Sequence, residues 1–212
     1  MTLQEFSIEF DLLYDNISSN QAPGLTEYEK SVFLTQAQDA LILDLYKGTA
    51  GDSFESTEEV TRYLNTLVKS HTYDNDEMSH DIEYGVHKYE LTLQPDTLFV
   101  ILDYGIIGNK VAKVVATPHN KLLKNINNPF KQEVIRIAED SKIILYSKSL
   151  ELKEYIVKYL STPTPIILKD ALEEGLTIKG YSDSEMECKL PEVLHRQILL
   201  RAVQMAKSVW QS

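Results

Sequence analysis

The densest group of residues that could do chemistry is the segment HTYDNDEMSHD, residues 71–81. Imidazole and carboxylate groups of this kind are ligands for divalent metal ions. In this segment they are His71, Asp74, Asp76, Glu77, His80 and Asp81. The pattern of a calcium loop is not met, because Met78 and Ser79 stand where an oxygen ligand and a glycine are required. We therefore expect a solvated acidic loop, with a metal site as the alternative.

Two further positions carry residue types found in catalytic sites, but the residues around them do not support catalysis. His195, beside Arg196 in the last helical segment, could act as a general base, yet no nucleophile is placed next to it. We expect it at the flank of a packed helix face or at a contact with a neighbouring subunit. Residues 51–53, Gly-Asp-Ser, resemble a fragment of a lipase nucleophile motif, but a polar connection between helices is the simpler interpretation.

The motifs that usually mark catalysis or nucleotide binding are missing. The sequence contains no Gly-x-Gly-x-x-Gly, Walker loop, His-Glu-x-x-His or Gly-x-Ser-x-Gly pattern. The single cysteine, Cys188, has Glu185 and Glu187 nearby, and their negative charge opposes a nucleophilic thiolate. We therefore expect no catalytic residue, no cofactor and no bound metal in this protein.

Composition excludes several other classes of protein. The chain has 212 residues, of which 43% are hydrophobic and 25% charged, as in a globular protein with one substantial core. Its net charge of −11 opposes general attraction to nucleic acid, and no dense Lys/Arg run supplies a basic patch. One cysteine excludes an internal disulfide and favours a reducing compartment. The most apolar stretch, residues 98–107, is short and contains Asp103, so no membrane partner is expected.

Three helix starts share a capping box, in which a hydroxyl and a carboxylate satisfy backbone N–H groups of the first turn. They are Thr2 with Glu5, Thr26 with Glu29, and Ser56 with Glu59. Each precedes apolar residues at steps of three and four, with Pro23 and Gly24 between the first two helices and Gly48 ending the second. This pattern predicts an N-terminal helical hairpin followed by a third helix.

From about His80 the apolar period changes to two, which predicts strands. Residues 83–93 and 96–107 are expected to pair across Gln94-Pro95. Further strands are expected at residues 109–116, 134–137, 143–147 and 152–160, with a short helix or loop at 119–128. The chain closes with a long helix that starts at Pro191 and has one wide apolar face.

The order of these elements predicts an α+β fold with a central, mainly antiparallel β-sheet. The helical hairpin and third helix precede the sheet, and the long C-terminal helix follows it. We expect one domain over residues 1–212, with two lobes as the alternative. In that case residues 1–70 and 188–212 form a helical lobe and residues 80–180 a β-rich lobe.

Four segments together resemble a family of virion proteins from tailed bacteriophages, especially crAss-like phages of Bacteroidetes hosts. They are EFDLLYDNISSNQAPGLTEYEKSVFLTQAQ (residues 9–38), NNPFK (127–131), YIVKYLSTPTPIIL (155–168) and CKLPEVLHRQILLRAVQMA (188–206). The resemblance covers nearly the whole chain. It implies a ring protein of the neck, or head-to-tail connector, located in the virion and in the host cytoplasm during assembly.

The implied partners are further copies of the chain in a closed ring, with twelvefold symmetry that matches a portal, together with the portal and adjacent neck or tail rings. Such a ring encloses DNA without binding it specifically, and the negative charge of the chain suits passage of a polyanion. Closing a ring head-to-tail requires two complementary faces on each subunit. The alternatives are a soluble adaptor or regulatory binding protein, and a small metal-dependent enzyme that uses residues 71–81.

We expect the N-terminal hairpin to contribute to the lateral contact between subunits. The Pro-rich segment 161–168 and the final helix are expected to contact an adjacent ring, because two prolines impose extended backbone. The predicted interface residues are Glu27, Tyr28, Glu29, Phe130, Pro163, Pro165, His195 and Arg196.

Overall fold

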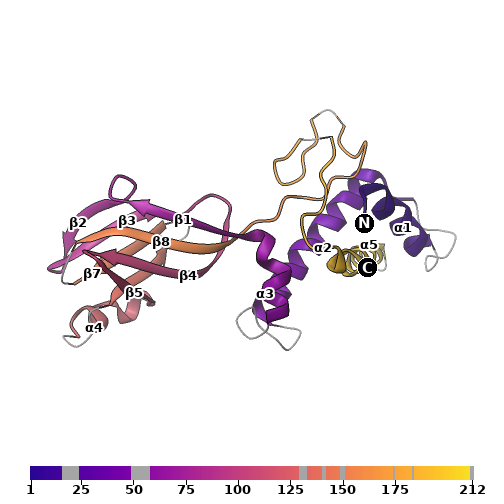
Figure 1. Cartoon of the computed structure of the whole chain (residues 1–212). Helices are drawn as coiled ribbons and strands as arrows, with labels where there is room; N and C mark the ends of the chain where they lie inside the picture. The colour runs from indigo at the N-terminus through magenta and orange to yellow at the C-terminus, as the bar shows by residue number, and fades with distance from the viewer. Residues whose placement is uncertain are drawn as a thin grey trace. The chain divides into compact units, whose positions relative to one another are not determined.

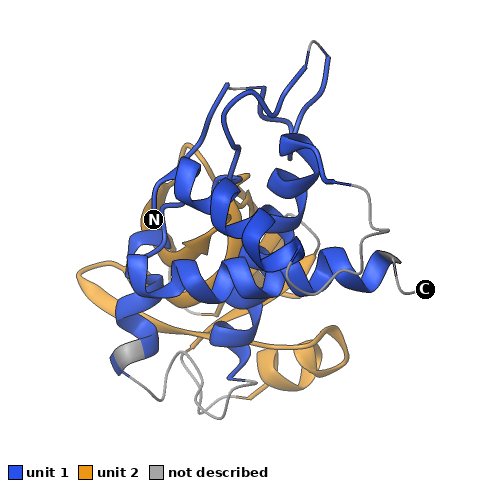
Figure 2. Cartoon of the chain, turned by 90° about the vertical axis from the view of Figure 1, so that its right-hand side faces the viewer, with its two compact units in different colours: residues 1–67, 163–212 blue, residues 68–162 orange. Residues whose placement is uncertain are grey.

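The computed structural model describes residues 1–15, 24–48, 58–128, 133–139, 142–148, 151–173, 175–182 and 184–210. Figure 1 shows the order of the elements, with helices at the start of the chain, strands in the middle and one helix at the end. The chain divides into two compact units, coloured separately in Figure 2. Unit 1 contains residues 1–67 and 163–212, and unit 2 contains residues 68–162. This order confirms the α+β fold class.

Two of the helices of unit 1, the first and the second, begin where the capping boxes predict. The helices of unit 1 are α1 (Leu3–Asp15), α2 (Glu27–Lys47), α3 (Glu58–Leu64), η1 (Asn65–Leu67) and α5 (Glu192–Trp210). The Thr2 hydroxyl accepts from the amide of Glu5, and the Thr2 amide donates to the Glu5 carboxylate. Thr26 and Glu29 form the same reciprocal pair. Pro23, Ser56 and the Glu59 side chain lie outside the described part of the chain.

Gly48 ends α2 in the left-handed region, with φ of 73°.

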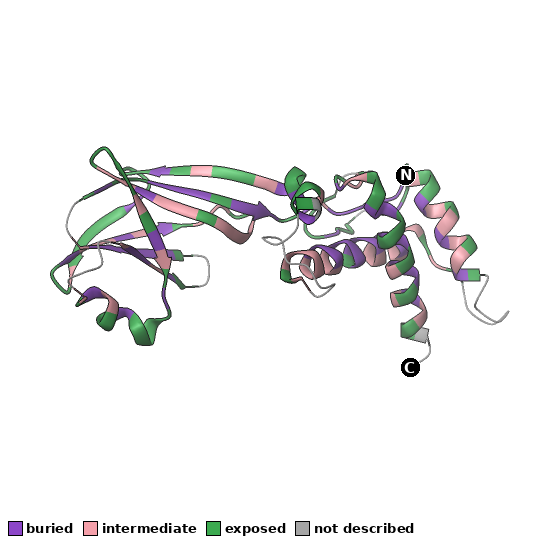
Figure 3. Ribbon diagram, turned by 60° about the horizontal axis from the view of Figure 1, so that its bottom comes forward, coloured by how far each residue is buried: buried purple, intermediate pink, exposed green. Residues whose placement is uncertain are grey.

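The core of unit 1 is made by one face of each long helix. The long C-terminal helix α5 packs against both α1 and α2. The buried apolar side chains of these helices are Phe6, Phe10, Tyr14, Leu34, Ala37, Leu41, Ile42, Leu194, Ile198, Leu199, Ala202, Val203 and Ala206. They recur at steps of three and four, as the sequence predicts. Figure 3 colours every described residue by its burial and shows buried, intermediate and exposed residues along the helices.

Unit 2 is an eight-stranded sheet in the order β1-β8-β4-β5-β6-β7-β3-β2. Its strands are β1 (Val68–Asp74), β2 (Ser79–Glu83), β3 (Val86–Thr92), β4 (Thr97–Ile107), β5 (Lys110–Ala116), β6 (Val134–Glu139), β7 (Lys142–Ser147) and β8 (Leu152–Ser161). All neighbouring strands are antiparallel except β5 and β6, which are parallel. Between β5 and β6 lie the short helices η2 (His119–Lys121) and α4 (Leu122–Ile126).

The sheet curls around one core, because side chains from strands at both ends of the order belong to the same buried cluster. Tyr73 of β1, Leu91 of β3 and Tyr155 of β8 are members of this cluster. A second cluster lies on the opposite face of β6 and β7, where Leu122 and Ile126 of α4 pack against them. Successive residues of β7 therefore alternate between the two clusters.

Two expectations for the strands are wrong. Residues 68–74 and 79–83 form β1 and β2, where the sequence predicts no strand. Both are edge strands with mostly polar, exposed residues, so the apolar period is missing. The predicted strand 83–93 is broken by a two-residue turn at Tyr84 and Gly85, whose φ values are 54° and 73°. A tyrosine at positive φ is not a usual turn signal.

The predicted pairing of residues 83–93 with 96–107 is also wrong. Strand β3 pairs with β2 and β7, whereas β4 pairs with β5 and β8. Between β3 and β4 the chain makes a turn, in which the Thr97 amide donates to the Gln94 carbonyl at 2.9 Å. The choice of partners is a long-range property, because the apolar pattern of a strand specifies which face is buried and not which strand lies beside it.

Gly105 on β4 provides a test of how closely this core is packed. A Cβ atom at this position would lie 2.5 Å from Cδ1 of Leu152, which is 1% exposed. We expect Gly105→Ala to lower the free energy of unfolding by about 2 kcal/mol, because the buried leucine must shift. Urea unfolding measures the effect. Gly24→Ala, at a site with no atom within 4 Å of the added Cβ, is the control, and equal midpoints for the two variants would contradict the prediction.

Candidate interaction surfaces

The segment 71–81 is mostly exposed, as the sequence predicts, but it is not a loop throughout, because its two ends are strand residues that pair with β8 and with β3. His71 and Asp74 belong to β1, His80 and Asp81 belong to β2, and the turn lies between them. His71 Nε2 lies 3.3 Å from a carboxylate oxygen of Glu77. Within the described residues, no group of three or more His, Cys, Asp or Glu side chains is arranged to hold a metal ion. The alternative of a metal enzyme at this segment therefore gains no geometric support.

Glu27 and Glu29, two of the predicted interface residues, both have contacts within unit 1. Glu29 is the carboxylate of the capping box of α2. Glu27 belongs to an ion network that joins α1 to α2 through Lys30, which is only 3% exposed. Lys30 Nζ lies 2.7 Å from Asp11 and 2.9 Å from Glu27. Desolvation lowers the pKa of Lys30, but the hydrogen bonds that Lys30 donates to both carboxylates outweigh it, so that the pKa is raised.

Tyr28 is half-buried beside this network. A charge reversal at Glu27 or Glu29 would therefore disturb α2 itself as well as any surface that the hairpin presents. An assembly defect in such a variant has to be compared with its folding.

Pro163 and Pro165 are buried and lie in an extended segment that runs along α2. Its backbone is held by a polar stripe on that helix, made of Ser31, Thr35 and Gln38. The amide of Leu168 donates to Ser31 Oγ at 2.9 Å, and the amide of Ile166 donates to Thr35 Oγ1 at 3.1 Å. Gln38 Nε2 donates to the carbonyl of Thr164 at 2.8 Å.

The spacing of these contacts follows from the geometry of the two elements. Residues four apart on a helix are separated by about 6 Å along the axis, and residues two apart on extended chain by about 6.7 Å. Ser31 and Thr35 therefore meet Leu168 and Ile166, with the segment running antiparallel to α2. All three stripe side chains are at most 3% exposed, so the prolines act inside this subunit by keeping the backbone extended.

His195 and Arg196 occupy different environments although they are adjacent. His195 is 7% exposed, packs against the ring of Phe6 and lies 2.9 Å from the carbonyl oxygen of Leu190 through Nε2. Its Nδ1 lies 2.9 Å from the α-amino nitrogen of Met1, so a neutral imidazole donates at Nε2 and accepts at Nδ1. Arg196 is exposed and forms an ion pair with Glu9 of α1. The histidine is therefore a packing residue of α5.

The environment of His195 predicts a pH dependence of unit 1. Burial lowers the pKa of His195, and the Met1 amino group lowers it further against the raising effect of the Leu190 carbonyl. The unfolded chain therefore binds a proton at His195 more tightly than the folded chain does. The free energy of unfolding should fall as the pH drops below about 6.5, and it should level off below the pKa of His195 in the folded protein. His195→Gln should flatten the slope of melting temperature between neutral pH and about pH 5. Equal slopes for both proteins would contradict this.

The remaining predicted site residues are placed as follows. Phe130 and residues 51–53 lie outside the described part of the chain. Cys188 contacts Gln38, with Sγ 3.3 Å from Oε1. Burial raises the pKa of the Cys188 thiol to about 11, which leaves it a poor nucleophile at neutral pH.

Sequence reasoning missed a buried polar cluster in unit 2. Tyr155 is fully buried and donates through its hydroxyl to Asp103 Oδ2 at 2.7 Å. Arg136 of β6 lies 3.1 Å from the same oxygen. Burial, together with the charge of Asp103, raises the pKa of Tyr155. The sequence signals this cluster only through single charged residues, Asp103 and Arg136, that interrupt two otherwise mainly apolar strands.

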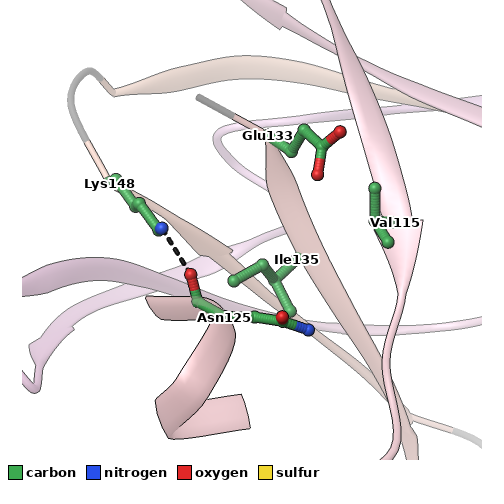
Figure 4. Close-up of a pocket in the computed structure, with 5 residues that line it drawn as sticks. All are labelled: Val115, Asn125, Glu133, Ile135 and Lys148. Atoms are coloured by element: carbon green, nitrogen blue, oxygen red, sulfur yellow. Dashed lines mark hydrogen bonds between the residues drawn. The ribbon is translucent and has the colours of Figure 1, made fainter. Parts of the chain in front are cut away.

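A small hollow lies near α4 and is drawn in Figure 4. It is lined by Val115, Asn125, Glu133, Ile135 and Lys148. Lys148 donates to the carbonyls of Asn125 and Asn128 and so holds the end of α4. The enclosed volume is about 10 Å³, which accommodates no more than about one water molecule. This hollow is therefore a packing feature and not a substrate pocket.

Large apolar side chains are exposed on both units, and where several of them lie together on one face they can form a contact surface. They are Ile8, Leu12, Ile82, Tyr84, Leu102, Val111, Leu123, Leu176, Tyr181, Val193, Leu200 and Val209. In the described part of the chain, no helix is both long and apolar enough to cross a lipid bilayer. These exposed apolar side chains are the available surface for contacts with other proteins.

Comparison with known proteins identifies the family. The sequence profile described as "Phage tail ring protein 3/4" matches residues 1–211, and the chain belongs to this family. It is 37% identical to ring protein 3 of Bacteroides phage crAss001, over 97% of this chain and 95% of the relative. It is 29% identical to ring protein 4/5 of the same phage, over 100% and 94% of the two chains. The chain is thus a structural ring protein of a crAss-like phage, as the resemblance implies.

Proposed function

We propose that this chain forms a closed, twelvefold ring in the neck of the virion, between the portal and the tail, and that it surrounds the DNA channel without catalysing a reaction. The observation that carries the proposal is membership of the ring-protein family over essentially the whole chain. Each subunit has a net charge of −11, so a ring of subunits creates a negative potential around its channel. DNA can then pass without adhering to the wall.

Partly exposed residues at the start of α2 and exposed Arg196 remain our candidates for contacts with neighbouring subunits or rings. Pro163 and Pro165 are buried, so we propose that they support such contacts indirectly, by keeping the backbone of unit 1 in place. A ring that stacks on a portal needs rigid subunits, because ordering flexible segments on binding costs free energy and weakens the contact.

The test is quantitative mass spectrometry of purified virions, followed by fractionation into capsids, necks and tails. We expect the chain to co-fractionate with the portal at a ratio of one copy per portal subunit, with a major capsid protein as the reference. A chain that is found only in the lysate of infected cells would disprove a virion role. A constant ratio to a tail protein in fractions free of portal would instead disprove the neck position.

A further inference from the structure

Two faces of this subunit, one on the sheet and one on α1, carry exposed apolar residues and differ in charge. The first, here called the sheet patch, is the outward face of β4, β5 and β8, made of Leu102, Tyr104, Ile106, Val111, Lys113 and Lys158. The register places Leu102 opposite Lys158, Tyr104 opposite Lys113, and Ile106 opposite Val111. Their neighbours along the strands, such as Ala112 and Val157, face the core.

The sheet patch is apolar, partly exposed and basic, although the chain as a whole is acidic; Ile156, opposite Tyr104 on the same face, is 9% exposed. Leu102 is 50% and Val111 is 69% exposed. Among the described residues, neither Lys113 nor Lys158 has an ion-pair partner, and Glu154, opposite Ile106, supplies a carboxylate at one end only. An uncovered sheet face with unpaired lysines is suited to an acidic, amphipathic partner.

The second face, here called the α1 patch, has those properties. Ile8 and Leu12 are 53% and 57% exposed and lie one turn apart on α1. Around them are the carboxylates of Glu5, Glu9 and Asp15. Glu5 also caps the helix, and Glu9 pairs with exposed Arg196, so Asp15 is the carboxylate of the patch for which the described residues provide no ion-pair partner. The outer side of α1 is therefore apolar along its middle and acidic along its edges.

We propose that the α1 patch of one subunit packs on the sheet patch of the next copy of this chain, and that this head-to-tail contact closes the ring; the inference rests on the proposed function. Ile8 and Leu12 are separated by about 6 Å along the helix, and alternate residues of β4 by about 6.7 Å, so the helix can lie along the strand with its side chains in register. Identical patches would repel each other, whereas unlike patches attract, which favours a heterologous contact.

The first test cross-links subunits in assembled particles. The full-length chain carries Leu12→Cys and Val111→Cys, is incorporated into particles by complementation, and is treated with a short bismaleimide. We expect a ladder of covalently joined subunits. Native Cys188 reacts slowly because burial raises the pKa of its thiol to about 11. The matched control pairs Leu12→Cys with Ile82→Cys, which is 67% exposed on β2, and should give no ladder.

These outcomes separate the contact from the proposed function. If the Leu12/Val111 variant enters particles but gives no ladder, the proposed contact is wrong and the proposed function stands. The same holds if the Leu12/Ile82 control gives an equal ladder. A chain absent from particles would overturn both proposals.

The second test reverses the charges. Lys113→Glu with Lys158→Glu should reduce incorporation at least about 30-fold, as expected for two central interface positions. Adding Glu9→Lys and Asp15→Lys should restore incorporation and the ladder. Unchanged incorporation of the first variant, or a failure of rescue although both variants remain folded monomers by circular dichroism and sedimentation, would overturn the contact.

Discussion

Replacing Asp103 with alanine should lower the free energy of unfolding of unit 2 by about 3 kcal/mol. The side chains of Asp103 and Arg136 are only 12% and 16% exposed, and Asp103 also accepts the hydroxyl proton of fully buried Tyr155. The substitution leaves the guanidinium of Arg136 without its ion-pair partner and the phenol of Tyr155 without its acceptor in the interior of a curled sheet. An uncompensated buried charge is costly because water is not available to replace the lost partner.

The measurement is urea unfolding followed by far-ultraviolet circular dichroism. Asp81→Ala, at an exposed position of β2, is the control and should change the midpoint little. Tyr155→Phe should cost about 1–2 kcal/mol, because it removes one hydrogen bond and keeps the ion pair. If Asp103→Ala and Asp81→Ala unfold at the same urea concentration, the cluster does not stabilise the sheet.

Replacing Ser31 with alanine together with Thr35 with valine should destabilise unit 1 by about 3 kcal/mol, because two buried backbone amides lose their acceptors. These amides belong to Ile166 and Leu168, whose side chains are fully buried. Hydrogen exchange provides a direct readout, since both amides should lose protection while those in the middle of α5 keep it.

Gln36→Ala, on the exposed side of the same helix, controls for changes in helix propensity. Retained protection of Ile166 and Leu168 in the double variant would show that the stripe does not hold the segment. A loss of protection throughout unit 1 would instead show that the segment and the helices unfold together.

The parts of the fold that the sequence predicts correctly are those governed by local chemistry. The capping boxes at Thr2 and Thr26 place the starts of α1 and α2, and Gly48 places the end of α2. The apolar period of three and four predicts the buried face of α5, from Leu194 to Ala206. In each case the signal and its effect lie within one or two turns of helix.

The failures concern edge strands, strand partners and polar contacts. Strands β1 and β2 have few apolar residues, and the turn at Tyr84 has an unusual residue at positive φ. The stripe of Ser31, Thr35 and Gln38 appears in the sequence as an ordinary polar face of a helix. Its partners are more than a hundred residues away, so no local pattern identifies it. The cluster around Asp103 is hidden for the same reason.

By itself, the sequence determined the fold class, the starts of α1 and α2, most strands and the ring-protein family, because local propensities and a chain-long series of motifs carry that information. Only the tertiary structure decided which strands pair, that the prolines at 163 and 165 are buried against α2, and that an apolar face on β4 and β5 is left uncovered. These features depend on residues far apart in the chain, and their free energies become defined only when the whole core closes.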